Sequence, residues 1–535
     1  MPQPKQFVIT LLVIEFLVGF ASNKVSAQRY TDVHSFNCAT EACYFMNPAI
    51  LAQGRDGNLY GTSWWGGTAQ YGAIFKVTPS GAATTLANLN CTGTAGCSPY
   101  SGLTVGRDGN FYGANSEGGQ YNYGNLFKIT PSKVMTILHQ AGGGTSDIFS
   151  PWAPPIQGKD GNFYGVAPGG AYKITVAGVF SIINHSPPLP VYAPLIQATD
   201  GYFYGTAATG GTHDCGDVFK MSTTGAIQVI YNFEYVNGCS PYAPVVQGTD
   251  GNFYGTTAYG GSAGGGVIYK LTPKGVITVL RHLSGTVLPT PFAGLVSATD
   301  GNLYGASVGG GKGWGVLFKI TKAGVYTELY AVPNDYTAVG RFPYSTPIQH
   351  TNGKIYGLMY VGGSQDEGTL YSLDVGLAPF VRALNPSGIP GNTIEILGQG
   401  FTGTTSVKFG TGAATFTVVS ATYLTAVIPT DAVTGWITVT TPTATLKSAT
   451  TFKVLPKITS FTPTTGAVGT VVTITGAAFT GTTKVTFGGV AATSFTVVNA
   501  TQIKATVPTG AKTGKIAVTT PGGTATSSGT FTVTQ

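Results

Sequence analysis

Residues 250–255 read Asp-Gly-Asn-Phe-Tyr-Gly, and this phrase recurs along the chain at intervals close to 50 residues, with one shorter interval. Asp-Gly favours a two-residue hairpin turn, because glycine readily accepts the positive φ that such turns require. A repeat of this length with strand-like content is typical of a β-propeller built from four-stranded blades. The copies begin at Asp56, Asp108, Asp160, Asp200, Asp250, Asp300 and, in degenerate form, Asn352.

Each repeat predicts four strands, illustrated by the copy around Asp250. We expect an innermost strand over 242–248, a second over 252–257, a third over 267–272 and an outermost over 276–282, with a glycine-rich loop at 259–265. The aspartate is expected to shape the turn rather than to catalyse a reaction. The tyrosine of each repeat is expected to pack between neighbouring blades.

The two ends of the repeat region predict how the ring closes. Residues 30–37 resemble an outermost strand without preceding partners, and residues 369–374 resemble a third strand with no fourth strand after it. Pairing these two segments would complete seven blades and remove the exposed edges of an open array. The predicted fold is therefore all-β, with a seven-bladed β-propeller over residues 28–375.

The repeat resembles the bacterial tandem repeat called GloVer. The resemblance is carried by Asp-Gly-Asn-Leu-Tyr-Gly-Thr at 56–62, by Gly-Gly at 66–67 and by Gly-x-x-Phe-Lys-x-Thr-Pro-x-Gly at 72–81, all kept in order along residues 30–375. The copy after Asp160 departs from the pattern, since the short segment 166–170 replaces the usual long loop. This resemblance implies an exported, surface-associated protein and no established activity.

Two copies of another unit follow the repeats. Phe-Thr-Gly-Thr-Thr at 401–405 recurs at 479–483, within stretches that predict short strands separated by turns. Both copies resemble the IPT/TIG immunoglobulin-like family, which implies spacers or adhesive arms of surface proteins. We therefore expect two immunoglobulin-like β-sandwiches, at residues 376–455 and 456–535.

The N-terminus reads as an export signal. An apolar run follows Lys5, and small residues at 25–27 suit cleavage, so residues 1–27 are predicted to be a signal peptide. We expect a secreted or cell-surface protein with no membrane span in the mature chain. The net charge is +7, but the lysines of the C-terminal region are scattered singly and no base-stacking pattern accompanies them, so nucleic acid is not an expected partner.

Six cysteines in an exported chain suggest disulfide bonds. In the ring model, the loops between outermost and innermost strands and the loops between second and third strands emerge on the same face. That arrangement selects one set of pairs. The pairs are Cys38–Cys43, Cys91–Cys97 and Cys215–Cys239. No Cys-x-x-Cys or paired-histidine spacing is present, so neither a metal site nor a cofactor is predicted.

Variable loops on a rigid scaffold are where binding usually occurs. The long loops carry aromatic residues that could hold sugar rings or a protein partner, which gives a candidate ligand site on one face. Its residues are Trp64, Trp65, Tyr71, Tyr121, Tyr123, Tyr259, Trp314 and Tyr360. The leading hypothesis is a monomeric, non-enzymatic binding or adhesion protein for a glycan or a surface protein.

Two alternatives remain open from the sequence. A carbohydrate-active enzyme, either a glycoside hydrolase or a lyase, could use the loop carboxylates Glu117, Asp214, Asp366 and Glu367. A structural surface or matrix protein would have no discrete ligand. No common hydrolase, metalloprotease or nucleotide-binding motif is present.

Overall fold

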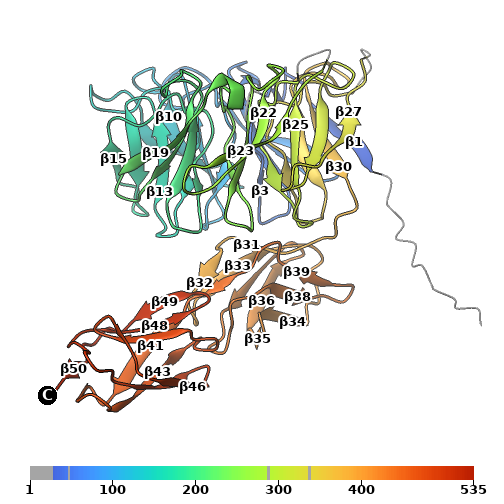
Figure 1. The fold of residues 1–535 in the computed structure, drawn as a ribbon. Helices are drawn as coiled ribbons and strands as arrows, with labels where there is room; N and C mark the ends of the chain where they lie inside the picture. The colour runs from blue at the N-terminus through green and yellow to red at the C-terminus, as the bar shows by residue number, and fades with distance from the viewer. Residues whose placement is uncertain (1–27, 46–48, 286–288, 335–338, 535) are drawn as a thin grey trace, which may run out of the picture.

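The computed structural model describes residues 28–45, 49–285, 289–334 and 339–534, and it is an all-β protein (Figure 1). Within these residues the only helix is the 3-10 turn η1 (Tyr235–Asn237). None of the helices in the described part could cross a membrane. The predicted signal peptide, residues 1–27, lies outside the described residues.

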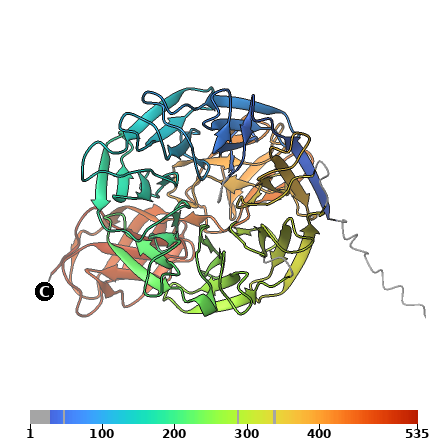
Figure 2. The ribbon, with the colours of Figure 1, turned by 90° about the horizontal axis from the view of Figure 1, so that it is seen from above.

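Seven four-stranded antiparallel sheets, counted over the described residues, form a ring (Figure 2). From the axis outward they are β3 (Ala52–Gln53), β4 (Leu59–Ser63), β6 (Ala73–Val77), β7 (Ala83–Asn88); β8 (Thr104–Val105), β9 (Phe111–Asn115), β10 (Asn125–Ile129), β11 (Met135–Gln140); β12 (Ile156–Gln157), β13 (Phe163–Ala167), β14 (Gly170–Ile174), β15 (Phe180–Asn184); β16 (Ile196–Gln197), β17 (Phe203–Ala207), β18 (Asp217–Met221), β19 (Ile227–Asn232); β20 (Val246–Gln247), β21 (Phe253–Thr257), β22 (Val267–Leu271), β23 (Ile277–His282); β24 (Val296–Ser297), β25 (Leu303–Ser307), β26 (Val316–Ile320), β27 (Tyr326–Ala331); and β28 (Ile348–Gln349), β29 (Ile355–Met359), β30 (Thr369–Asp374), β1 (Arg29–Ser35). A small extra pair joins β2 (Ala42–Cys43) to β5 (Trp65–Gly66).

The ring closes through the chain ends, as the sequence predicts. β1 pairs antiparallel with β30, and Tyr30 lies opposite Leu373. The innermost strands are shorter than predicted: β20 covers Val246–Gln247 rather than 242–248. The proline at 244 within the predicted strand explains the difference, because proline has no N–H to donate to a neighbouring strand.

The repeated Asp-Gly-Asn-x-Tyr-Gly phrase forms a hydrogen-bonded turn. Asp250 Oδ2 accepts hydrogen bonds from Asn252 Nδ2 at 2.8 Å and from the Tyr254 hydroxyl at 2.8 Å. Gly251 has φ +81°, which a side chain would strain. The aspartates therefore shape turns, as predicted, and the buried tyrosines pack between neighbouring sheets.

Glutamines at the ends of innermost strands tie neighbouring sheets together. Gln247 Oε1 accepts a hydrogen bond from Thr199 N at 2.9 Å in the preceding sheet, and its Nε2 donates to Gly251 O at 3.1 Å in its own turn. Gln157, Gln197 and Gln349 make the same bridge to the backbone N–H of the preceding sheet. The turns of neighbouring sheets are thus held in a fixed relation around the axis.

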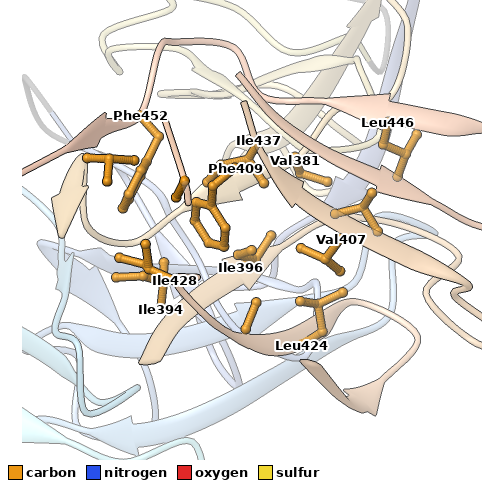
Figure 3. Packing of buried hydrophobic residues seen from close by; sticks show 14 of the residues in the cluster. Val381, Ile394, Ile396, Val407, Phe409, Leu424, Ile428, Ile437, Leu446 and Phe452 are labelled. Atoms are coloured by element: carbon orange, nitrogen blue, oxygen red, sulfur yellow. The ribbon is translucent and has the colours of Figure 1, made fainter. Parts of the chain in front are cut away.

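Two β-sandwiches follow the ring. The first contains β31 (Arg382–Ala383), β33 (Thr393–Leu397), β37 (Tyr423–Val427) and β36 (Phe416–Ser420) in one sheet; β35 (Gly412–Ala413), β34 (Ser406–Phe409), β38 (Ile437–Thr440) and β39 (Thr445–Lys447) in the other; and β32 (Ser387–Gly388) paired with β40 (Lys453–Val454). Its core gathers Ile396, Phe409, Leu424 and Phe452 between the sheets (Figure 3). Alternating inward residues on both sheets explain this core.

The second sandwich repeats the first. Its sheets are β41 (Lys457–Thr462), β43 (Val471–Ala477), β47 (Gln502–Thr506) and β46 (Phe495–Asn499); β45 (Val490–Ala491), β44 (Lys484–Phe487), β48 (Ile516–Thr520) and β49 (Gly523–Thr526); and β42 (Thr465–Gly466) paired with β50 (Thr532–Val533). Phe479, Phe487 and Phe531 are fully buried in its core. The sequence repeat between residues 401–405 and 479–483 therefore reflects a repeated fold.

The first sandwich docks on the face of the ring that carries the Asp-Gly turns, below the ring in Figure 1. Thr422 Oγ1 donates to Arg55 O at 2.8 Å, and the Arg55 guanidinium lies over the Tyr423 ring at 4.8 Å. Arg382 Nη2 donates to Gln53 Oε1 at 2.7 Å. The short turns of this tight-turn face were expected to offer little shape for recognition, yet their exposed backbone and Arg55 provide the docking contacts.

Candidate functional site on the long-loop face

The opposite face of the ring carries the two longer kinds of loop, which meet there in pairs. Backbone bridges join Cys239 to Tyr259 and Arg341 to Val361, each linking an outer-to-inner loop to the following loop between second and third strands. The structure contains the three disulfides that the ring model selects, Cys38–Cys43, Cys91–Cys97 and Cys215–Cys239. These links hold the long-loop face in shape.

A chain of aromatic side chains lies on this face, just before the innermost strands. Its members, named here the axial aromatic ring, are Tyr100, Trp152, Tyr192, Tyr242, Phe292 and Tyr344, and all are half-buried. Ring centroids are 4.9 Å apart for Trp152 and Tyr192, 5.4 Å for Tyr192 and Tyr242, 5.3 Å for Tyr242 and Phe292, and 5.4 Å for Phe292 and Tyr344. The contacts run through consecutive sheets, so each repeat adds one aromatic group.

The axial aromatic ring converges on the axis of the propeller. Tyr100 and Tyr192 belong to the second and fourth sheets, yet their ring centroids are 5.6 Å apart. Burial, followed by the neighbouring hydroxyls of Tyr192, Tyr242 and Tyr344, raises the pKa of Tyr100 to about 12. The phenols therefore stay neutral and can donate hydrogen bonds at ordinary pH. The site offers apolar ring faces together with several hydroxyl groups.

Two of the aromatic residues predicted from the sequence adjoin this ring. Tyr360 contacts Tyr344 with centroids 5.5 Å apart, and Tyr259 contacts Phe292 edge-on at 5.9 Å. Tyr44 extends the chain of contacts beyond Tyr360, at 5.4 Å. Tyr259 is 40% exposed, so the rim of the site remains open to solvent on that side.

The other predicted aromatic residues form separate groups on the rim of the long-loop face. Trp64 and Trp65 have ring centroids 5.8 Å apart, and Trp65 is 6.3 Å from Tyr71. Tyr123 packs on Phe149 at 5.1 Å.

Trp314 packs on Phe342 at 5.0 Å beneath the Arg341 guanidinium. Tyr121 lines a groove together with His139, Asp147 and Phe180. The structure therefore divides the eight predicted residues among several places instead of one patch.

The loop carboxylates considered for catalysis have structural partners. Glu117 Oε2 accepts from Ser98 Oγ at 3.0 Å, and Asp214 Oδ1 accepts from Gly210 N at 2.9 Å. Asp366 accepts from the Gly362 backbone and pairs with Arg341, and Glu367 accepts from the Cys38 backbone at 2.5 Å. Each carboxylate thus stabilises a loop.

Glu117 also lies near Cys91 and Cys97, in the one group within the described residues that could suit a metal ion by composition. The two sulfur atoms are bonded to each other. A disulfide offers no thiolate to a metal ion.

Sequence reasoning missed the axial aromatic ring, although a signal was present. A proline precedes the aromatic residue in five of its six positions, at 99, 151, 241, 291 and 343. The prediction placed Tyr242 in a regular innermost strand, where side chains would alternate between two faces. The structure instead ends the loop with this aromatic residue, before the strand begins at Val246.

Comparison with known proteins identifies the repeats. The model of the Gloeobacter/Verrucomicrobia repeat matches residues 22–186 and 190–416, and the IPT/TIG domain model matches residues 379–454 and 456–533. No curated protein matches the chain.

Similar solved structures share the fold at low identity. A streptogramin B lyase is 14% identical, with 65% of this chain and 97% of that chain covered and a TM-score of 0.46. An inactive virginiamycin B lyase from Staphylococcus aureus is 14% identical, with 65% and 99% covered and a TM-score of 0.47. A protein from a xyloglucan utilization locus in Bacteroides uniformis is 23% identical, with 28% and 48% covered and a TM-score of 0.16. Likeness of this degree does not indicate an activity.

Proposed function

The chain belongs to the Gloeobacter/Verrucomicrobia repeat family, and we propose that it is an exported binding protein that holds a glycan at its axial aromatic ring. The observation that carries this proposal is the chain of ring contacts from Tyr100 to Tyr344 at the axis of the long-loop face. The opposite face is occupied by the first sandwich, which leaves the long-loop face as the face available to a ligand.

The chemistry of the ring suits a carbohydrate. The C–H faces of a sugar ring pack against aromatic rings, and its hydroxyl groups need hydrogen-bond partners that tyrosine can supply. The half-buried state of these side chains means that little conformational entropy is lost when a ligand binds. A protein partner that presents aromatic or aliphatic side chains is the alternative ligand.

Export is supported by the three disulfides, since such bonds persist in oxidising compartments. In this proposal residues 1–27 are removed as a signal peptide, residues 28–375 form the binding unit, and residues 376–455 and 456–535 serve as arms that hold it away from the cell surface. The protein acts as a monomer.

Binding is favoured over catalysis because the four loop carboxylates already hold backbone or side-chain partners. A glycosidase needs two carboxyl groups with separated pKa values facing one substrate bond. None of these four carboxylates combines such a position with freedom from its loop.

A glycan array probed with residues 28–535 tests the proposal. Each bound glycan is then incubated overnight with the protein, and the products are analysed by mass spectrometry. Binding without cleavage supports the proposal, and cleavage would show an enzyme instead. If no glycan binds, a structural or protein-binding role replaces the proposal.

A further inference from the structure

A second cavity lies at the opposite, tight-turn end of the propeller axis. Its volume is about 370 Å³. The innermost strands β3, β8, β12, β16 and β28 or their turns contribute its walls, and the start of the first sandwich contributes Arg382, Leu384 and Pro386. This cavity, named here the basal cavity, is therefore built jointly by the ring and the sandwich docked on it (Figure 1).

The charged groups that line the basal cavity are all cations. They are Arg107, Lys159 and Arg382, and no aspartate or glutamate lines the cavity. Their printed hydrogen bonds go to uncharged oxygen atoms: Arg107 Nη2 to Gly158 O at 2.9 Å, Lys159 Nζ to Ala198 O at 2.9 Å, and Arg382 Nη2 to Gln53 Oε1 at 2.7 Å.

None of these three cations forms an ion pair with any carboxylate in the described part of the chain. Arg382 Nε is buried without a hydrogen-bond partner. The carboxylates nearest in charge interaction have other partners: Glu395 lies 3.9 Å from Arg55, and Asp160 and Asp200 accept from the tyrosines of their own turns.

Burial acts on all three groups. It lowers the pKa of Arg107 and of Lys159, and it lowers the pKa of Arg382 to about 10. Lys453, in β40 of the sandwich, adds further positive charge near Lys159. Buried charges in proteins are normally paired, because removing an ion from water without a counter-charge is costly. Three unpaired cations around one cavity are the arrangement that an anion would complete.

We propose that the basal cavity binds an oxyanion, held by Arg107, Lys159 and Arg382. A guanidinium group presents parallel N–H donors that match the oxygen atoms of a carboxylate, sulfate or phosphate, and an ammonium group adds a point charge. The site is separate from the axial aromatic ring, so it goes beyond the proposed function. A bound anion would also link the propeller to the first sandwich, since Arg382 belongs to the sandwich.

Calorimetric titration of residues 28–535 tests this inference with three probes: sodium sulfate, sodium phosphate and galacturonate. Ionic strength is held constant with sodium chloride, and glucose serves as the neutral counterpart of galacturonate. Binding of sulfate or phosphate identifies an inorganic ligand, whereas binding of galacturonate alone identifies the carboxylate of an organic acid. Either result supports the inference, and the absence of binding by all three would overturn it.

Variants locate the site. Arg107→Gln and Lys159→Gln should each weaken anion binding roughly tenfold, the value expected for the loss of one charge-assisted hydrogen bond. Lys220→Gln removes a half-buried lysine that lies over Tyr202 outside the cavity, and it should leave binding unchanged. Unchanged affinity in an Arg107→Gln/Lys159→Gln double variant would contradict the assignment. The wild-type titration does not depend on whether a variant folds.

Discussion

The ring of Tyr60 stacks on Phe111 of the next sheet, with centroids 3.9 Å apart. Its hydroxyl donates to Asp56 Oδ2 at 2.7 Å, so one side chain joins a turn to a neighbouring sheet. Tyr60→Ala should destabilise the propeller by about 3–5 kcal/mol, because it leaves a large cavity. Tyr60→Phe should cost only about 1 kcal/mol, because it removes one hydrogen bond.

Urea-induced unfolding measures both changes, with Tyr202→Ala as the control at an exposed tyrosine. Equal losses for Tyr60→Ala and Tyr60→Phe would show that the hydroxyl, rather than the stacked ring, carries the contact.

The disulfide pairing is a second prediction. Peptide mapping without reduction should recover Cys38–Cys43, Cys91–Cys97 and Cys215–Cys239 as the linked pairs. Replacing Cys215 and Cys239 by serine should cost about 3 kcal/mol, because the bond closes a loop of 24 residues. Recovery of Cys215 linked to Cys91 would contradict the assignment of the loops to one face.

Stability should depend on pH through Asp217. This residue is 3% exposed at the start of β18, its Oδ1 has no hydrogen-bond partner, and burial raises its pKa to about 7 from an ordinary value of 3.8. Between pH 4 and 7 the folded protein therefore holds a proton that the unfolded chain has lost. The free energy of unfolding should fall as pH rises through this window.

Asp217→Asn should remove that dependence, because the amide does not titrate. Asn125, which begins the corresponding strand β10, shows that an amide fits there, since it donates to Thr94 O and Ala95 O. At pH 8 the variant should be more stable than the wild type by on the order of 2–4 kcal/mol. Urea unfolding at pH 5 and pH 8 measures this. Parallel pH profiles for the two proteins would refute the role of Asp217.

The ring could be predicted from the sequence because its determinants are local and repeated. Each Asp-Gly turn sets its own hairpin, and the unpartnered segments 30–37 and 369–374 indicate their own pairing. The axial aromatic ring could not be predicted in the same way. The contact of Tyr100 with Tyr192 joins repeats that are not neighbours, so it depends on the diameter of the closed ring. The docking of Thr422 and Tyr423 on Arg55 depends on the shapes of two folded units.

That docking gives a further prediction. An Arg55→Ala/Tyr423→Ala double variant removes the cation–π contact between the ring and the first sandwich, which is worth about 1–2 kcal/mol when partly desolvated. The sandwich should then sample other orientations, and small-angle X-ray scattering should show a larger radius of gyration. Lys484→Ala in the second sandwich is the control. An unchanged scattering profile would show that Gln53, Arg382 and Thr422 suffice for docking.

The last prediction concerns where a ligand binds. A Tyr192→Ala/Tyr242→Ala variant removes the centre of the axial aromatic ring. Aromatic hot spots typically contribute about 2 kcal/mol or more, so affinity for a glycan identified on the array should fall roughly 30-fold or more. Trp64→Ala/Trp65→Ala tests the rim group predicted from the sequence, and Tyr202→Ala on the tight-turn face is the control.

Affinity is measured by calorimetry, with melting temperature recorded for each variant to detect loss of folding. Loss of binding in the Tyr192/Tyr242 variant, with both other variants unaffected, places the ligand on the axis, because only that variant alters the converging rings. Loss only in the Trp64/Trp65 variant would move the site to the rim of the first sheet. If both aromatic variants bind normally and a protein ending at residue 375 does not, recognition belongs to the sandwiches.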